Sequence, residues 1–326
     1  MVAKIFGGFL KFTAGRPKPL YASYIVTNRC NLRCSFCDSW RMNKPELPTR
    51  KALIAIDEVC RSGVALFDFG GGEPLLRKDL PLLAKRASSY GCIVGMDTNG
   101  TLLKRNAVSE IARAFDVVLV SLDGPREVHD RWRGVRGTFD KAVKAIILLK
   151  EGGVRVGANT MVSPWNIEIL PDFIEWLGSL VDFIMIQPIH PYPPPPQNRP
   201  SPKAVRELLN YLLNLKRKNP GFLLVPTDFV KGFKLFFDGK VPKICHAGEL
   251  YVSIDPMGRL LACTARSDIV LGNLLEHSTS EILDERTKNP DWLKVSSCRG
   301  CWLECTAAVS ISMMKPLQEA LHLIGL

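Results

Sequence analysis

Histidine is scarce in this chain of 326 residues, which contains five, and none lies near the cysteines at positions 30, 34 and 37. No uninterrupted apolar run reaches the length of a membrane span. The chain also lacks a G-x-G-x-x-G or Gly-Lys-Ser/Thr loop opening a helix, and a basic tract with interleaved aromatic residues. These absences argue against a membrane-spanning protein and a phosphate-binding loop, and no nucleic-acid partner is expected.

The composition is that of a globular protein, with 46% hydrophobic and 23% charged residues. The net charge of +11 favours anionic partners without choosing among nucleic acid, phosphorylated substrates and acidic lipid, and solubility explains it equally well. The ten cysteines are too clustered, in too long a chain, for a small secreted disulfide scaffold. A reducing compartment is therefore expected, namely the cytoplasm, and no signal-peptide cleavage site is evident.

Short apolar runs rich in β-branched residues alternate with helical patterns over the first two hundred residues. One helix is expected at about Arg50 to Ser62, after Thr49, and another after Thr138, ending near Gly152. Right-handed crossovers would curl six such strand-helix units into a partial barrel, with the functional residues at the carboxyl ends of the strands. The expected strands are Tyr21 to Val26, Val64 to Phe69, Cys92 to Met96, Val117 to Leu122, Val154 to Val162 and Phe183 to Gln187.

The proline-rich stretch at 191–200 cannot continue a sheet and marks a boundary or an extended loop. A helix is expected from Lys203 to Lys218, followed by a hairpin through Leu250 to Ile254 and Arg259 to Ala262. The expected organisation is an amphipathic segment at 1–19, a barrel at 20–200, linking helices at 201–240, a small C-terminal domain at 241–310 and an amphipathic helix at 311–326.

Cys30, Cys34 and Cys37 form a C-x3-C-x2-C triplet, the most informative feature of the sequence. Three thiolates at this spacing can hold three corners of an iron-sulfur cube and leave the fourth iron open to bind and reduce a ligand. Structural zinc would need a fourth protein ligand. Zinc, buried structural cysteines and disulfides are the competing interpretations.

This triplet, with Phe36 before the third cysteine, resembles the signature of the radical S-adenosylmethionine (SAM) enzymes. The resemblance implies a 4Fe-4S cluster whose open iron is chelated by the methionine part of SAM. One electron would then cleave SAM and give a 5′-deoxyadenosyl radical that abstracts hydrogen from a substrate. It also implies a (β/α)6 partial barrel.

A glycine-rich motif follows the second expected strand, polar motifs end the third and fourth, and single polar residues lie in the fifth strand and at the end of the sixth. Gly70-Gly71-Gly72-Glu73 resembles the family's GGE motif, which binds the amino group of SAM. Ordinary turn chemistry is the alternative for the Thr98-Asn99-Gly100 and Ser121-Leu122-Asp123-Gly124 segments. The resemblance implies a SAM pocket formed by Gly71, Gly72, Glu73, Thr98, Asn99, Ser121, Asp123, Asn159 and Gln187.

The segment Ser121 to Asp140 looks like one shared by radical SAM proteins that carry a C-terminal cluster domain. His129 in this segment could act as a proton donor, but ordering of the loop by hydrogen bonding is the preferred interpretation. Cys60 and Cys92 are expected to be buried core thiols.

A second cysteine set consists of Cys245, Cys263, Cys298, Cys301 and Cys305. The spacing of Cys245, Gly258 and Cys263 resembles the opening of SPASM and twitch domains, although the later C-x2-C-x3-C run departs from the full SPASM pattern. One auxiliary 4Fe-4S cluster is expected, with Cys245, Cys263, Cys298 and Cys301 as ligands and Cys305 as the alternative fourth. A zinc knuckle is the competing interpretation.

The expected substrate class is a peptide or protein, followed by a lipid or isoprenoid, with a tetrapyrrole left open. Amphipathic patterns at both termini are interpreted as lids, or as a peripheral membrane contact. A reductant such as ferredoxin or flavodoxin is the expected protein partner. The competing hypotheses are a zinc-stapled nucleic-acid-binding module and an electron carrier.

Overall fold

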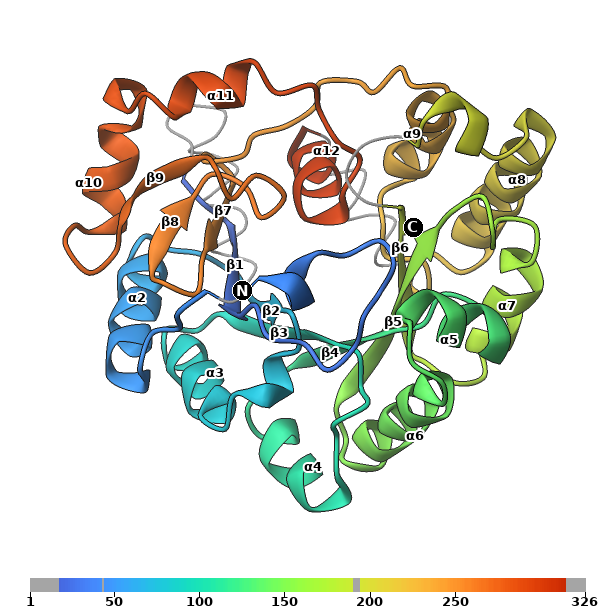
Figure 1. Ribbon diagram of the computed structural model, residues 1–326, viewed down its shortest axis with the longest axis horizontal. Coiled ribbons are helices and arrows are strands. Elements are labelled where there is room, and N and C mark those ends of the chain that lie inside the picture. The colour runs from blue at the N-terminus through green and yellow to red at the C-terminus, as the bar shows by residue number, and fades with distance from the viewer. Residues whose placement is uncertain (1–17, 43, 190–193, 315–326) are drawn as a thin grey trace.

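The computed structural model describes residues 18–42, 44–189 and 194–314. Its first six strands lie in sequence order, and each pairs in parallel with the next, which confirms the predicted α/β architecture. Figure 1 shows the helices on the outer side of this curved sheet. The strands are β1 (Tyr21–Thr27), β2 (Leu66–Gly71), β3 (Ile93–Thr98), β4 (Val117–Ser121), β5 (Arg155–Val162) and β6 (Phe183–Pro188).

The helices pack apolar faces against the sheet. In α2 (Thr49–Arg61) the fully buried Ala52, Ile56 and Val59 recur at helical spacing. Thr49 is the first residue of this helix and its hydroxyl donates to Asp79, so it does not cap the helix from outside. The other helices along the barrel are α3 (Leu80–Ser89), α4 (Arg105–Ala112), α5 (Arg126–Arg133), α6 (Thr138–Glu151), α7 (Leu170–Leu177), α8 (Pro202–Lys218) and α9 (Thr227–Phe237).

The C-terminal region continues the same sheet. Strand β7 (Tyr251–Ile254) pairs in parallel with β1, and the order of the nine strands is β6-β5-β4-β3-β2-β1-β7-β8-β9. Strand β8 (Arg259–Leu261) returns antiparallel to β7, as the predicted hairpin requires, and β9 (Val270–Asn273) completes the extension. The second cysteine set is therefore attached directly to the barrel wall. Helices α10 (Thr279–Asp284) and α11 (Trp292–Ser296) follow.

The end of the described chain packs against α9 and β6. The indole of Trp302 stacks on Phe229 with a centroid separation of 5.5 Å and donates to the Phe229 carbonyl at 2.7 Å. Gly232 admits this ring, because a Cβ there would lie 1.9 Å from it. A short π-helix, η5 (Glu304–Ala308), and α12 (Val309–Met314) follow, and α12 lies between β6 and β7 in Figure 1.

The predicted terminal amphipathic segments fall mainly on residues 1–17 and 315–326, outside the described residues. Within the described part, Met313 is buried in a small cluster with Leu20 and Leu250. None of the helices in the described ranges is long and apolar enough to cross a membrane.

Candidate active site

Cys30, Cys34 and Cys37 lie on one loop, residues 28–38, which follows the carboxyl end of β1 and is termed the cysteine loop. Helix α5 fixes the backbone of this loop. The amide of Arg33 donates to the Arg133 carbonyl at 3.2 Å, and the amide of Ser35 donates to the Trp132 carbonyl at 3.1 Å. The end of α5 therefore sets the path of the chain between the three thiols.

Side chains strengthen this contact. The ring of Phe36 packs on Trp132 with centroids 5.4 Å apart, and the Arg133 guanidinium lies 5.3 Å from the Phe36 ring centroid. Gly134 ends the helix with φ of 70°, and a Cβ at this position would lie 2.4 Å from the Arg33 carbonyl oxygen. A glycine is required where α5 meets the cysteine loop.

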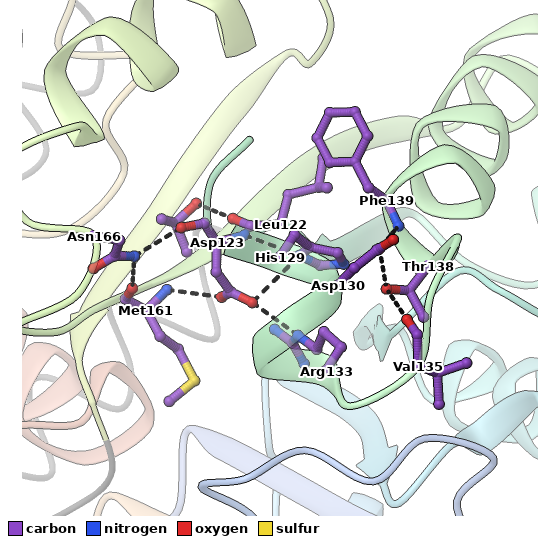
Figure 2. A network of polar contacts seen from close by, with 11 residues as sticks. Leu122, Asp123, His129, Asp130, Arg133, Val135, Thr138, Phe139, Met161 and Asn166 are labelled. Carbon is purple, nitrogen blue, oxygen red and sulfur yellow. Dashed lines mark hydrogen bonds and ion pairs between the residues drawn. The ribbon is translucent and has the colours of Figure 1, made fainter. Parts of the chain in front are cut away.

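Asp123 holds α5 in this position, as Figure 2 shows. Its buried carboxylate accepts from Arg133 Nε at 2.8 Å and from the Met161 amide at 3.2 Å. Its amide donates to Nδ1 of the buried His129 at 3.3 Å, the loop-ordering bond that the sequence favoured for this histidine. Burial alone would raise the pKa of Asp123, but the neighbouring Arg133 charge is the largest effect in the other direction, and that pKa lies well below its usual value.

Asp130 organises the other end of this segment. Its carboxylate accepts from the Phe139 amide and from the Thr138 hydroxyl, which joins α5 to the start of α6 (Figure 2). It also accepts from the Gly137 amide. The predicted Ser121 to Asp140 segment is therefore one hydrogen-bonded unit next to the cysteine loop.

The predicted GGE motif also contacts the cysteine loop. A Cβ on Gly71 would lie 2.3 Å from the Thr27 carbonyl oxygen, and one on Gly72 would lie 2.2 Å from that of Arg29. Glu73, which is fully buried, accepts from the Leu75 amide at 3.1 Å, the Thr98 hydroxyl at 2.7 Å and the Asn99 amide at 2.8 Å. The two glycines thus let β2 meet the loop, and the glutamate ties the motif to the end of β3.

Asn99 completes this connection, because its side-chain amide donates to Asn31 Oδ1 at 3.0 Å, one residue from Cys30. The sequence did not single out Asn31. Glu73, Thr98, Asn99 and the cysteine loop therefore form one polar network, which is where a SAM site was predicted.

The remaining predicted pocket residues lie farther along the sheet. Ser121 and Asn159 are paired in register on β4 and β5. Asn159 Nδ2 donates to Glu304 Oε1 at 2.9 Å, and Gln187 Oε1 accepts from the Glu304 amide at 3.2 Å. The structure thus joins Asn159 and Gln187 to the C-terminal region and encloses Asp123 in the α5 network. The roles of Ser121, Asp123, Asn159 and Gln187 in SAM binding stay predictions.

The three thiols of the cysteine loop suit a metal cluster. Burial raises the pKa of Cys34 to about 11, with the nearby Arg133 charge opposing this shift, and burial also raises the pKa of Cys30. Electrostatic interactions connect each of the three thiols with the others. Positively charged iron would keep such buried thiols in the thiolate form, so the donor set fits a cluster with three cysteine ligands.

Four thiols of the second set line one cavity of about 40 Å³, namely Cys245, Cys263, Cys298 and Cys301. Burial, reinforced by the neighbouring thiols, raises the pKa of Cys245 to about 11 and that of Cys263 to about 12. Cys305 does not line this cavity, but it packs against the cluster that contains Tyr251 and Cys263. It interacts electrostatically with Cys263 and Cys301 first, and then with Glu304 and Asp97 in the barrel. The donor set again fits an iron-sulfur cluster. Among the described residues, no three His, Cys, Asp or Glu side chains are placed to hold a single metal ion.

Sequence reasoning missed a group of acids inside the barrel, formed by the buried Asp68 on β2 and the half-buried Asp97 on β3 and Glu304 on η5. Burial raises the pKa of all three, to about 8 for Glu304. The neighbouring acids add to this shift for Asp68 and Glu304, whereas Asp68 and Asn159 oppose it for Asp97. The available signal was a single acid within each of two apolar strands, Leu66-Phe67-Asp68-Phe69 and Val94-Gly95-Met96-Asp97. An acid within a buried strand indicates an inward-facing polar site.

Two family models match this chain. Residues 24–177 match the model described as the radical SAM superfamily, and residues 245–302 match SPASM, described as an iron-sulfur cluster-binding domain. Together the matches contain the cysteine loop, the GGE motif and four of the five cysteines of the second set.

Curated relatives fall into two groups. Fe-coproporphyrin III synthase of Methanosarcina barkeri is 35% identical over 47% of this chain and 39% of its own length. PqqA peptide cyclase of Granulibacter bethesdensis is 27% identical over 85% of this chain and 78% of its own length. The chain spans only about two fifths of the length of Fe-coproporphyrin III synthase and of two further curated relatives that it matches.

A solved structure has the same fold. The crystal structure of Streptococcus suis SuiB bound to precursor peptide SuiA superposes with a TM-score of 0.68 at 17% identity, and the match covers 91% of this chain and 73% of that one. At this identity the likeness is one of architecture.

Proposed function

This chain belongs to the radical SAM superfamily and carries a C-terminal SPASM iron-sulfur domain, and from that premise we propose that it is a radical SAM enzyme that abstracts hydrogen from a peptide or protein. Membership implies a 4Fe-4S cluster and SAM in the barrel and auxiliary iron-sulfur in the C-terminal domain. When bound, these groups supply an electron and a 5′-deoxyadenosyl radical. The observation that carries the proposal is the polar network that joins the three-thiol loop to Glu73, Thr98 and Asn99.

We propose a separate role for each group of residues in the barrel. Cys30, Cys34 and Cys37 hold the cluster, while α5 fixes the loop between them. The GGE motif binds the amino group of SAM, and the ends of β3 to β6 bind the rest of it. The cofactor-binding residues proposed are Gly71, Gly72, Glu73, Thr98, Asn99, Ser121, Asp123, Asn159 and Gln187.

The extent of the matches favours a peptide substrate. The PqqA peptide cyclase match runs through both the barrel and the SPASM region, covering 85% of this chain. The Fe-coproporphyrin III synthase match covers 47% of the chain at higher identity, which keeps a tetrapyrrole substrate as the second candidate. The C-terminal domain would border the substrate in either case, because Glu304 reaches Asn159 inside the barrel.

An auxiliary cluster in the C-terminal domain would be held by Cys245, Cys263, Cys298 and Cys301, the four thiols that line the cavity. It would anchor substrate or accept the product electron. We also propose a ferredoxin or flavodoxin as the reductant, a reducing cytoplasmic environment, and a peripheral membrane contact only if the terminal segments bind lipid.

Oxygen-free reconstitution with iron and sulfide tests the assignment. The protein should contain about eight irons per chain, the total for two cubane clusters, and release 5′-deoxyadenosine from SAM after reduction. Cys34→Ala should abolish this release, whereas Cys60→Ala, at a buried cysteine on α2, should retain it. Release by the Cys34→Ala protein, or zinc in place of iron, would refute the proposal.

A further inference from the structure

Three acids from separate elements gather inside the barrel without a cation. Asp68 is 8% exposed, and electrostatic interactions connect it with Asp97 and Glu304 and connect Asp97 with Glu304. None of the three takes part in an ion pair within the described ranges. Buried acids are ordinarily paired, because burial without a partner is costly.

Oxygen atoms without hydrogen-bond donors near these acids indicate the kind of ligand that would bind beside them. Asp97 Oδ1, Asn159 Oδ1 and Glu304 Oε2 are closed off from solvent, and no described residue donates a hydrogen bond to them. All three atoms can act as acceptors, and they belong to β3, β5 and η5. Because most buried polar atoms in proteins are satisfied, a set of orphan acceptors indicates a ligand rich in N–H donors.

Hydrogen bonds fix two of the three side chains that carry these oxygens. Asn159 Nδ2 donates to Glu304 Oε1 at 2.9 Å, and the Glu304 amide donates to Gln187 at 3.2 Å. Gly95 keeps the neighbouring strand position free of a side chain, because a Cβ there would lie 2.6 Å from Asp68 Oδ1. Hydrogen bonds therefore hold Asn159 and Glu304 in place, and Gly95 leaves room for Asp68 beside Asp97.

The cluster also has a defined location. Asp97 directly precedes Thr98 and Asn99, which bond to Glu73, and Glu304 directly precedes Cys305 in the C-terminal region. A group bound by these acids would lie between the proposed SAM pocket and the second cysteine set. A substrate would have to enter the same region to meet both cofactors.

We propose that Asp97, Asn159 and Glu304 form a subsite for a cationic group of the substrate, a guanidinium or ammonium such as an arginine or lysine side chain of a peptide. This inference rests on the proposed function and deepens it by naming a chemical class of substrate. Guanidinium carries five N–H donors in a plane and can serve acceptors that come from separate strands. A metal ion would require the acids to converge, and no such group of three exists among the described residues.

Binding of small probes to the reconstituted full chain tests this subsite. The probes are N-acetyl-arginine methylamide, N-acetyl-lysine methylamide and the neutral N-acetyl-norleucine methylamide, each titrated by calorimetry in the presence of SAM. The two cationic probes should bind saturably and the norleucine probe should bind at least about tenfold more weakly. The stronger of the two cationic probes identifies the side chain.

Two nearly isosteric variants are tested, so that the result does not depend on either one folding correctly. Asp97→Asn and Glu304→Gln should each weaken binding of the cationic probes by about tenfold or more. Glu285→Gln removes an acid from an exposed pair with Lys288 and should leave binding unchanged. The cationic probes should also bind to Cys34→Ala protein, which separates the subsite from SAM cleavage.

Equal binding of the norleucine probe, or unchanged binding in both acid variants, would overturn the subsite even if SAM cleavage persists. Saturable Mg²⁺ or Mn²⁺ binding that the same variants abolish would replace it with a metal site. Conversely, selective binding of the cationic probes without any SAM cleavage would retain the subsite and refute the proposed function.

Discussion

Arg133 joins the buried carboxylate of Asp123 to the cysteine loop. Its Nε donates to Asp123 Oδ2 at 2.8 Å, while its backbone carbonyl accepts from the Arg33 amide at 3.2 Å. Asp123 is fully buried and Arg133 is 8% exposed, so neither group can exchange its partner for bulk water. The charge pair therefore controls both the stability of α5 and the geometry of the loop that carries three thiols.

Replacing Arg133 by methionine should lower the free energy of unfolding and weaken binding of the cluster held by Cys30, Cys34 and Cys37. The variant leaves Asp123 buried without its cation, which costs about 3–5 kcal/mol for pairs of this kind. Arg126→Met is a matched control on the same helix, because Arg126 forms an exposed pair with Asp140 that contributes less than about 1 kcal/mol. Urea denaturation and iron content measure the two effects. Equal stability of the two variants would contradict this role of Arg133.

The same pair predicts a pH dependence. Since the pKa of Asp123 is lower in the folded protein than in the unfolded chain, its stabilisation is fully present above the unfolded pKa of about 3.9 and is lost as pH falls through the folded pKa. The stability difference between the wild type and Asp123→Asn should be constant from about pH 7 to about pH 5 and should shrink toward about pH 3. Urea denaturation at each pH measures it; a difference that widens in acid would reverse the assignment.

Much of the barrel could be predicted because buried parallel strands read as short apolar runs. The expected run from Val117 to Leu122 became β4 at Val117–Ser121, and the other five strands agree to within a few residues. The hairpin of β7 and β8 was predicted from its turn. The pairing of β7 with β1 could not be predicted, because the paired residues Tyr21 and Tyr251 are 230 positions apart in the chain. Neither strand carries a local sequence signal for the other.

The location of the candidate site could also be predicted from the sequence, but not all of its contacts. Motifs at strand ends correctly located Glu73 next to Thr98 and Asn99, since carboxyl ends of parallel strands meet at one edge. The partners of individual side chains depend on tertiary packing. For that reason the bond of Asp123 to Arg133 and the reach of Glu304 into the barrel could not be derived from spacing alone.

Gly134→Ala should displace the cysteine loop. At φ of 70° any side chain is strained, and here the new Cβ would also lie 2.4 Å from the Arg33 carbonyl oxygen. Gly137→Ala is the matched control, because its φ of 78° carries the same strain while nothing lies within 4 Å of its Cβ. The control should lose about 1–2 kcal/mol of stability and keep its iron. Gly134→Ala should lose about half of its iron; similar iron contents in the two proteins would show that the contact does not position the loop.

The fifth cysteine of the C-terminal region should be dispensable for the auxiliary cluster. Cys298 lines the cavity with Cys245, Cys263 and Cys301, whereas Cys305 is not part of its lining and packs beside Tyr251 and Cys263. Serine is a poor replacement for a thiolate ligand, so Cys298→Ser should lower the iron content by about four atoms per chain, and Cys305→Ser should leave it unchanged. Iron analysis and electron paramagnetic resonance of the reduced proteins distinguish the two. If Cys305→Ser alone loses the auxiliary signal, Cys305 is the fourth ligand instead of Cys298. The short helix η5, which carries both Glu304 and Cys305, would then turn the Cys305 thiol toward the cavity when the cluster binds.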